Sequence, residues 1–309
     1  MALLTRKRLI AVVVLLTASA APAHAQAVLA PTEKLDFDRP EAWGMKYYTS
    51  LALLTSMGVP ERKEKGQIDF GFEGGHVPQM SDAERRIGFN GTSLQDVNKT
   101  DWFGRFRGSV GLGQGIALEL GYTPPIELGG ARPHFFALAL GRPFELSDTF
   151  RLGVRGYGQI GKIEGDITCG ADAVAAGDDL ELNPFLCVEP SKDRVYQNVI
   201  GLELVAGYDG RSRFKPYVGL LASYMDLEFN IDALYSEGTV EDHTVQLTSG
   251  TTVSATAGLT YAAGERWRIT AEMFYAWLSI ARPSGSLPAT SSANEGLLNG
   301  RVFVAYRVH

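Results

Sequence analysis

The sequence has no apolar run long enough for a transmembrane helix, which needs about 20 consecutive apolar residues. The run from Leu9 to Leu16 is much shorter, and no later segment approaches that length. Basic residues are also in deficit, since 29 Lys and Arg face 35 Asp and Glu and the net charge is −6. These absences argue against a helical membrane protein and give no support for a nucleic-acid partner.

Cysteine is scarce as well. Cys169 and Cys187 are the only two, and we expect a disulfide that closes a loop with 17 residues between them. In the chain-entropy view such a link contributes about 3 kcal/mol. A metal centre would need further ligands nearby, and residues 163–193 contain no histidine. The pair therefore predicts a structural staple, and the sequence predicts no metal site and no cofactor.

The first 25 residues have the composition of a cleaved signal peptide. Three basic residues, Arg6 to Arg8, precede the apolar run, and Ala23-His24-Ala25 provides a small-residue cleavage site. Cleavage would remove three basic residues and no acid, which changes the net charge from −6 to −9. The leader predicts export through the inner membrane.

Apolar and polar residues alternate with a period of two through much of the remaining chain. Ile68, Phe70 and Phe72 fall on one side of a strand, and Asp69 and Glu73 fall on the other. A closed barrel with lipid outside and a polar interior requires this pattern, because no backbone edge can face hydrocarbon. We predict an all-β fold, a closed antiparallel transmembrane β-barrel. A sandwich of two soluble sheets would alternate in the same way and is the alternative.

Ten strands satisfy the even number of such barrels and give alternating short and long connections. The predicted strands are, in chain order, about 67–76, 101–111, 115–123, 133–142, 149–162, 196–208, 214–229, 249–262, 267–281 and 296–308. The barrel domain would then cover residues 67–309, with both ends in the periplasm.

Residues 26–66 would form an N-terminal periplasmic segment with a helix over about 39–57. Asp38 can cap this helix, and Pro40 suits its first turn. Trp43 and Tyr47 follow at helical spacing, and Gly58 provides a stop. An eleventh strand is the alternative, but an odd number would break the alternation of connections. The sequence leaves open whether the helix caps the periplasmic mouth, enters the lumen or lies on the membrane.

Placing the apolar side outward defines the two faces of the wall. The predicted lipid face contains Ile68, Phe70, Phe72, Ile116, Leu118, Leu120, Phe136, Leu138, Leu140, Leu152, Val154, Ile200, Leu202, Leu204, Val302 and Val304. The predicted lumen charge network contains Asp69, Glu73, Glu119, Glu203, Glu272, Arg105, Arg107, Arg151, Arg155, Arg268 and Arg307. Interleaved charges of both signs in a narrow barrel are expected to pair and fill the interior. A ring of one sign, typical of an ion pore, is missing.

With its leader, alternation and loop lengths, the chain resembles the bacterial outer-membrane β-barrel proteins as a class over about 67–309. The resemblance implies a location in the bacterial outer membrane, contact with outer-membrane lipid and lipopolysaccharide, and use of the barrel-assembly machinery. Such proteins typically end in an aromatic residue, whereas this chain ends Tyr306-Arg307-Val308-His309. Tyr306 is the expected substitute.

Ten strands also make the chain similar to the omptins, outer-membrane proteases with an aspartate pair and an Asp–His pair. Asp242 and His243 are adjacent rather than spaced by one, and the loop at 124–132 has no aspartate. His134 could serve a barrel lipase, but a lone histidine at the rim is more often an interfacial polar group. We therefore predict no enzymatic activity.

The leading functional hypothesis is surface binding or an envelope-structural role, with the loop at 163–195 as the contact element for an unknown ligand or protein. A porin-like narrow channel or transporter for small or apolar solutes, gated by the 39–57 helix, is the second hypothesis. An outer-membrane hydrolase is the third.

Overall fold

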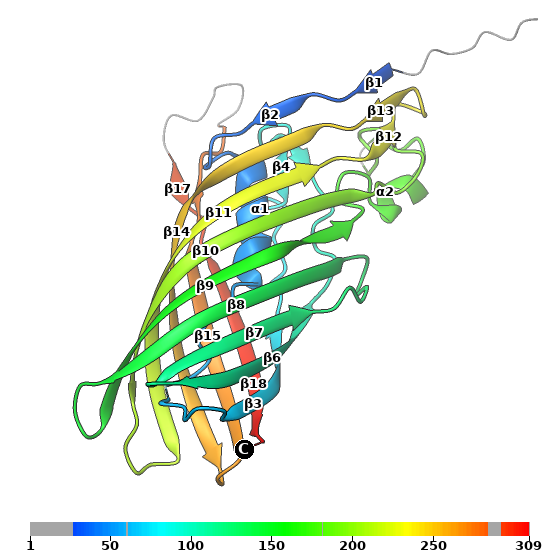
Figure 1. Ribbon diagram of the computed structural model, residues 1–309. Helices are drawn as coiled ribbons and strands as arrows, with labels where there is room; N and C mark the ends of the chain where they lie inside the picture. Colours follow the sequence, from blue (N-terminus) through cyan, green and yellow to red (C-terminus); the bar gives the residue numbers. More distant parts are fainter. Residues whose placement is uncertain (1–26, 60, 181, 284–291, 309) are drawn as a thin grey trace, which may run out of the picture.

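The computed structural model describes residues 27–59, 61–180, 182–283 and 292–308. Ten long antiparallel strands form a closed barrel (Figure 1), because β11 pairs with β10 on one side and β14 on the other. The wall strands are β3 (Ile68–His76), β6 (Trp102–Gly113), β7 (Ile116–Thr123), β8 (Arg132–Glu145), β9 (Phe150–Gly165), β10 (Asp193–Tyr208), β11 (Phe214–Asn230), β14 (Val245–Ala263), β15 (Trp267–Trp277) and β18 (Leu297–Arg307). All ten predicted strands and the predicted fold class are confirmed.

Connections at the two ends of the barrel differ in length. At one end, tight turns such as the one at Gly264 join neighbouring strands, and the chain ends there (Figure 1). At the other end, long loops carry small elements of their own. Outer-membrane barrels have short periplasmic turns and longer external loops, so we name the two ends periplasmic and external. The pattern suits a barrel built from hairpins, with the longer loops at the external end.

The outer face of the wall is apolar. Phe70, Leu138 and Ile200 are each about half to two-thirds exposed, as are most residues of the predicted lipid face. A sandwich would bury these side chains against a second sheet, and here they point away from a single closed sheet. The sandwich alternative is therefore wrong.

The N-terminal segment runs through the barrel. β1 (Ala27–Leu29) and β2 (Thr32–Lys34) pair in parallel with β13 and β14 at the external end. The helix α1 (Pro40–Leu51) then lies inside the barrel (Figure 1), and the chain continues to the periplasmic end, where β3 starts. Of the three positions that the sequence left open, the structure adopts the one inside the lumen. Residues 27–59 therefore do not form the predicted periplasmic segment.

The helix is shorter than the predicted 39–57. It ends at Leu51, and Ala52 follows as its C-cap. The carbonyls of the next residues turn toward arginines of the barrel wall instead of continuing the helical bonds. We call residues 35–59 the plug. The predicted leader, residues 1–25, lies outside the described residues.

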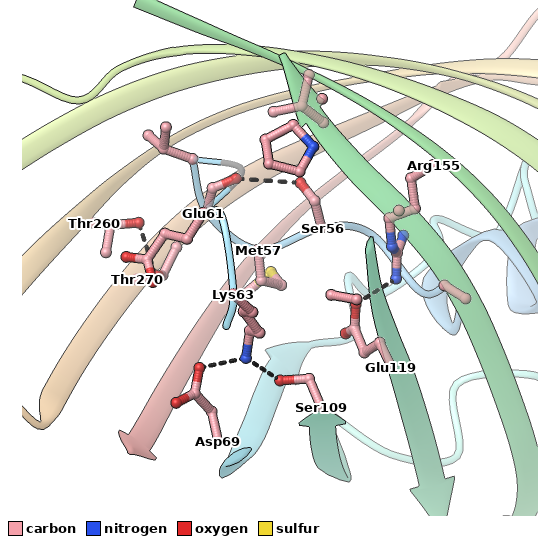
Figure 2. Close-up of a pocket in the computed structure, with 18 of the residues that line it drawn as sticks. Ser56, Met57, Glu61, Lys63, Asp69, Ser109, Glu119, Arg155, Thr260 and Thr270 are labelled. Atoms are coloured by element: carbon pink, nitrogen blue, oxygen red, sulfur yellow. Dashed lines mark hydrogen bonds and ion pairs between the residues drawn. The ribbon is translucent and has the colours of Figure 1, made fainter. Parts of the chain in front are cut away.

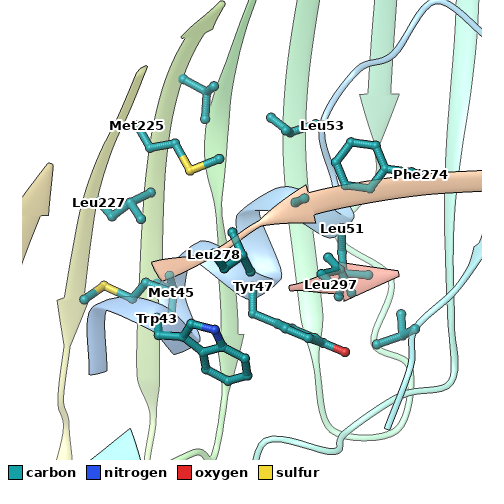
Figure 3. Packing of buried hydrophobic residues seen from close by; sticks show 14 of the residues in the cluster. Trp43, Met45, Tyr47, Leu51, Leu53, Met225, Leu227, Phe274, Leu278 and Leu297 are labelled. Carbon is teal, nitrogen blue, oxygen red and sulfur yellow. The ribbon is translucent and has the colours of Figure 1, made fainter. Parts of the chain in front are cut away.

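The main apolar core surrounds α1 in the external half of the barrel. Trp43, Met45 and Tyr47 of the helix pack against Leu227 of β11 and Phe274 of β15 (Figure 3). Each of these five side chains is at least 95% buried. Burial of apolar surface on this scale is the main stabilising contribution available to the helix, which is only three turns long.

The external loops contain short paired strands and a helix of five residues. These are β4 (Arg86–Gly88) with β5 (Ser93–Leu94), β12 (Ala233–Tyr235) with β13 (Val240–Asp242), β16 (Ser279–Ile280) with β17 (Ala293–Asn294), and α2 (Ala171–Ala175). In the described part of the chain, neither helix has the length and hydropathy needed to cross a membrane.

Candidate functional site

Four arginines of the wall hold the backbone of the plug. Arg301 donates to the carbonyls of Ser50, Leu51 and Leu53 at 2.8–3.1 Å, and Arg155 donates to that of Leu54 at 2.7 Å. The other two bind the carbonyls on either side: Arg105 binds Ala52, and Arg107 binds Thr55. Six consecutive carbonyls, 50–55, are therefore bound by guanidinium groups. The last turn of a helix leaves its carbonyls unpaired and carries partial negative charge, which cations complement.

Four glutamates balance these arginines. Glu73 lies 3.0 Å from Arg107, and it also lies within 4 Å of Arg105 and Arg301. Glu119 bridges Arg107 and Arg155. Glu203 and Glu272 complete this arginine–glutamate cluster with one carboxylate each, so its four arginines are matched by four glutamates.

Two of the glutamates also bind the plug directly. Glu203 accepts the N–H of Ser56 at 3.0 Å and pairs with Arg155 at 2.6 Å. Glu272 accepts the hydroxyls of Thr55 at 2.7 Å and of Tyr217 at 2.9 Å. Buried charges are tolerated only when they are paired and hydrogen-bonded. The plug thus supplies hydrogen bonds that the wall charges need, and the wall fixes the plug in the lumen.

A second set of charges holds the chain at the periplasmic mouth. Lys63 donates to Ser109 at 2.6 Å and to Asp69, as Figure 2 shows. Arg307 pairs with Glu61 at 2.6 Å and with Asp69 at 3.2 Å, and Arg268 binds the same two carboxylates. Burial lowers the pKa of the Lys63 ammonium, although Asp69 beside it acts in the opposite direction. We call the five charged residues, Glu61, Lys63, Asp69, Arg268 and Arg307, the mouth cluster.

A cavity of about 150 Å³ separates the mouth cluster from the arginine–glutamate cluster. Met57, Glu119 and Arg155 lie around it in Figure 2, with Lys63 and Asp69 on its periplasmic side. Its walls carry charges of both signs, so it has the character of a polar vestibule that ends at the plug.

A second cavity, of about 170 Å³, lies on the other side of α1, at the external end. The helix contributes Glu41, Gly44, Met45 and Tyr48, which recur at the 3, 4 and 7 spacing of one helix face. We call it the external cavity. The wall contributes a row of register partners from β10, β11 and β14, namely Val195, Phe229 and Gln246.

The loop that follows β3 covers the external cavity and is tied to the helix. Tyr47 donates to the carbonyl of Pro78 at 2.9 Å, and Tyr48 donates to that of Val97. Glu41 accepts the backbone N–H of Asn90 at 2.5 Å. This loop is therefore positioned by the plug and not only by the barrel wall.

The predicted disulfide is confirmed. Cys169 and Cys187 are bonded, with their Cα atoms 5.8 Å apart. Both are buried in a small apolar cluster with Ala233 and Tyr235 of the neighbouring loop. The link therefore ties the loop between β9 and β10 into a unit that packs on the β12–β13 hairpin.

The predicted lumen charge network occupies two levels of the barrel and its rim. Seven of its members, Glu73, Arg105, Arg107, Glu119, Arg155, Glu203 and Glu272, meet around the plug. Asp69, Arg268 and Arg307 belong to the mouth cluster, while Arg151 lies at the rim and pairs with Asp209 at 2.6 Å. These charges do not fill the interior as predicted, because they lie in the periplasmic part of the lumen and at its mouth, and the external part holds the apolar core around α1.

Sequence reasoning missed three charged residues of the site. Arg301 alternates with the outward Val302 and could have been found from the period of two. Glu61 and Lys63 lie in an irregular segment, which offers no periodicity. No sequence pattern indicates that wall arginines bind backbone carbonyls of the plug.

The Asp242–His243 pair is not arranged as a base with its orienting carboxylate. Asp242 accepts hydrogen bonds from Tyr235 and from the N–H of Thr244, whereas His243 contacts Glu241 at 2.9 Å. Burial, and after it the bond to Asp242, raises the pKa of Tyr235, which keeps its hydroxyl a donor. The absence of enzymatic activity stays a prediction. Among the described residues, no group of three or more His, Cys, Asp or Glu side chains could hold a metal ion.

No protein-family model and no curated protein matches the chain. Solved structures do. The translocator domain of the autotransporter NalP from Neisseria meningitidis is 14% identical, with 80% of this chain and 90% of that chain covered and a TM-score of 0.43. The outer membrane protease OmpT from Escherichia coli is 10% identical, with coverages of 78% and 92% and a TM-score of 0.40. The copper transporter OprC is 13% identical with a TM-score of 0.34, and this chain spans only 43% of its length.

The class follows from the chain's own features. A closed antiparallel sheet of ten strands, an apolar outer face and tight turns at one end define an outer-membrane type β-barrel. Within that class this barrel has its N-terminal segment inside the lumen.

Proposed function

We propose that the protein is a bacterial outer-membrane barrel that is sealed by its own N-terminal segment and works as a binding protein at its external end. The single observation behind the proposal is the run of six carbonyls, 50–55, bound by four wall arginines. A segment held in this way has no open path beside it for large solutes. Function is then left to the external loops and the external cavity.

Removal of one arginine would break several buried hydrogen bonds at once. Arg301 is 2% exposed and serves three carbonyls, with Glu73 3.9 Å away. Breaking a buried charge contact of this kind costs about 3–5 kcal/mol. Spontaneous release of the plug would break several such contacts at once and would be rare.

The test is conductance of the purified full chain in planar bilayers. We expect no stable openings from the intact protein. Deletion of residues 27–56 should produce stable openings, because it removes the helix and leaves the wall charges in an empty lumen. The matched control is deletion of residues 27–34, which removes β1 and β2 but keeps α1 and every arginine contact, and should stay closed. Stable large openings of the intact chain would refute the proposal.

A second candidate function is lateral transfer of apolar solutes into the membrane. A cavity of about 60 Å³ lies beside the external cavity and shares Tyr48, Val97, Ile167 and Val195 with it. It reaches the wall at Trp102 and Pro133, at a level where β7 has already ended. A route here would carry solutes sideways without opening the lumen. Filling it with Ala131→Trp should slow uptake of an apolar dye by cells, and unchanged uptake would remove this candidate.

A further inference from the structure

We infer that the external cavity binds a single-ring aromatic molecule that carries a hydroxyl or amino donor and no negative charge. The inference rests on the proposed function, since it assigns a ligand to the external end of a sealed barrel. Size, lining, charge and one unfilled hydrogen bond each limit the ligand.

The size of the cavity sets the size of the ligand. Its volume is about 170 Å³, and an apolar protein cavity of about 150 Å³ accepts benzene. A fused ring system or a long acyl chain would not fit without movement of the plug or the covering loop.

The lining favours an aromatic ring. Met45 and Tyr48 come from one face of α1, and Phe229 comes from the wall opposite. Ile87 and Phe89 come from the covering loop. Aromatic and thioether side chains make favourable contacts with aromatic rings beyond the contribution of area alone.

The absence of a side chain on Gly44 leaves room above the helix. A Cβ atom there would lie 2.5 Å from Cδ1 of Ile87. Glycine therefore lets the covering loop approach α1 closely while the helix face beside it stays open to the cavity.

The charges around the cavity disfavour anions. Its lining has three carboxylates, Glu33, Glu41 and Asp242, and one guanidinium, Arg39. Arg39 is already bound to Glu41 at 2.8 Å. A carboxylate ligand would meet net negative charge and find no free cation among the described lining residues.

The unfilled hydrogen bond belongs to Gln246. Its side-chain nitrogen donates to Glu33 at 3.3 Å, and since a carboxylate only accepts, this contact fixes the amide orientation. Its oxygen is buried and has no donor among the described residues. A buried acceptor without a partner costs free energy that a ligand O–H or N–H would recover.

The test uses 4-fluorophenol, 4-fluorotoluene and 4-fluorobenzoate, titrated into the full chain in micelles and followed by fluorine NMR, with a micelle-only blank. We expect saturable binding of the phenol, about 2- to 10-fold weaker binding of the toluene, which lacks one hydrogen bond, and no saturable binding of the benzoate. Gln246→Leu should lower the phenol affinity to that of the toluene and leave the toluene affinity unchanged.

The matched control is Gln197→Leu. Gln197 is also buried, on β10, and also has an unpartnered amide atom, but it does not line the external cavity. It should leave the phenol affinity unchanged. The inference is overturned if none of the probes shows saturable binding, or if the benzoate binds as tightly as the phenol. It is also overturned if the two glutamine variants change the phenol affinity equally. A lipid found by native mass spectrometry that the phenol cannot displace would overturn it as well. If ligand binding fails while the intact chain stays closed in bilayers, only the assignment of the ligand is refuted. Stable openings of the intact chain would refute the proposed function instead.

Discussion

The two halves of the lumen hold the plug in different ways. In the periplasmic half, wall side chains bind its backbone through charged hydrogen bonds, as Arg301 and Glu203 do. In the external half, wall side chains such as Leu227 and Phe274 bury the side chains of α1. The switch occurs within single strands: β15 faces inward with Glu272 and then with Phe274. A helix that ends inside a barrel needs both kinds of contact, apolar packing for its side chains and charged hydrogen bonds for the unpaired carbonyls at its C-terminus.

The largest effect should come from the charged half. Arg301→Ala should lower the free energy of unfolding by about 3–5 kcal/mol, because it removes a buried guanidinium that binds three plug carbonyls and lies within 4 Å of Glu73. Urea unfolding in micelles measures this. Arg151→Ala is the comparison: its salt bridge to Asp209 is partly exposed and should contribute less than about 1 kcal/mol. Equal losses of unfolding free energy in the two variants would show that the plug contacts stabilise the protein no more than a salt bridge at the rim does.

The apolar half is tested by two leucines of β11. Leu227→Ala should lower the free energy of unfolding by about 2–5 kcal/mol, because this side chain is 1% exposed against the plug. Leu220 is 58% exposed on the opposite face of the strand, so Leu220→Ala in micelles should cost much less. The same urea series measures both, and a larger loss at Leu220 would contradict the placement of α1.

Changes in the external loops should affect the stability of the barrel less than changes in either half of the lumen. The double variant Cys169→Ser with Cys187→Ser removes a link confined to the loop between β9 and β10. We expect faster cleavage of this loop by added protease. The unfolding midpoint of the barrel should fall by less than the chain-entropy figure of about 3 kcal/mol implies, because the loop can open while the wall stays folded. A large shift of the midpoint would mean that the loop supports the wall.

The smallest expected effect concerns the N-terminal strands. β2 pairs with only three residues of β14, from Val245 to Leu247. Deletion of residues 27–34 should therefore change the midpoint little and increase accessibility at the exposed edge of β14 in hydrogen exchange. A collapse of stability would show that the plug depends on these strands rather than on the two halves of the lumen.

The wall strands were predictable from particular residues. The alternation of Phe70 and Phe72 with Asp69 and Glu73 fixes a strand and its faces without any partner being known. A shift by one residue would turn charges toward lipid, so the register is strongly specified. The disulfide followed from there being only two cysteines.

The plug was only partly predictable. The helix itself has a sequence signal in Trp43, Tyr47 and Pro40, but its end at Leu51 depends on arginines from strands up to 250 residues away. The apolar inner face of β11 also escaped prediction, because Leu221 and Met225 alternate with apolar outward residues and so give no contrast between faces.

The sequence by itself determined that ten strands close with an apolar outer face, because the period of two and the membrane together leave one arrangement. Only the tertiary structure decided what occupies the interior. Charges that face inward can pair with each other or with any polar group brought among them, and the local sequence does not distinguish these partners. In this structure the partner is the plug: the apolar side chains of α1 pack in the external half of the lumen, and the carbonyls at its C-terminus bind charges of the periplasmic half.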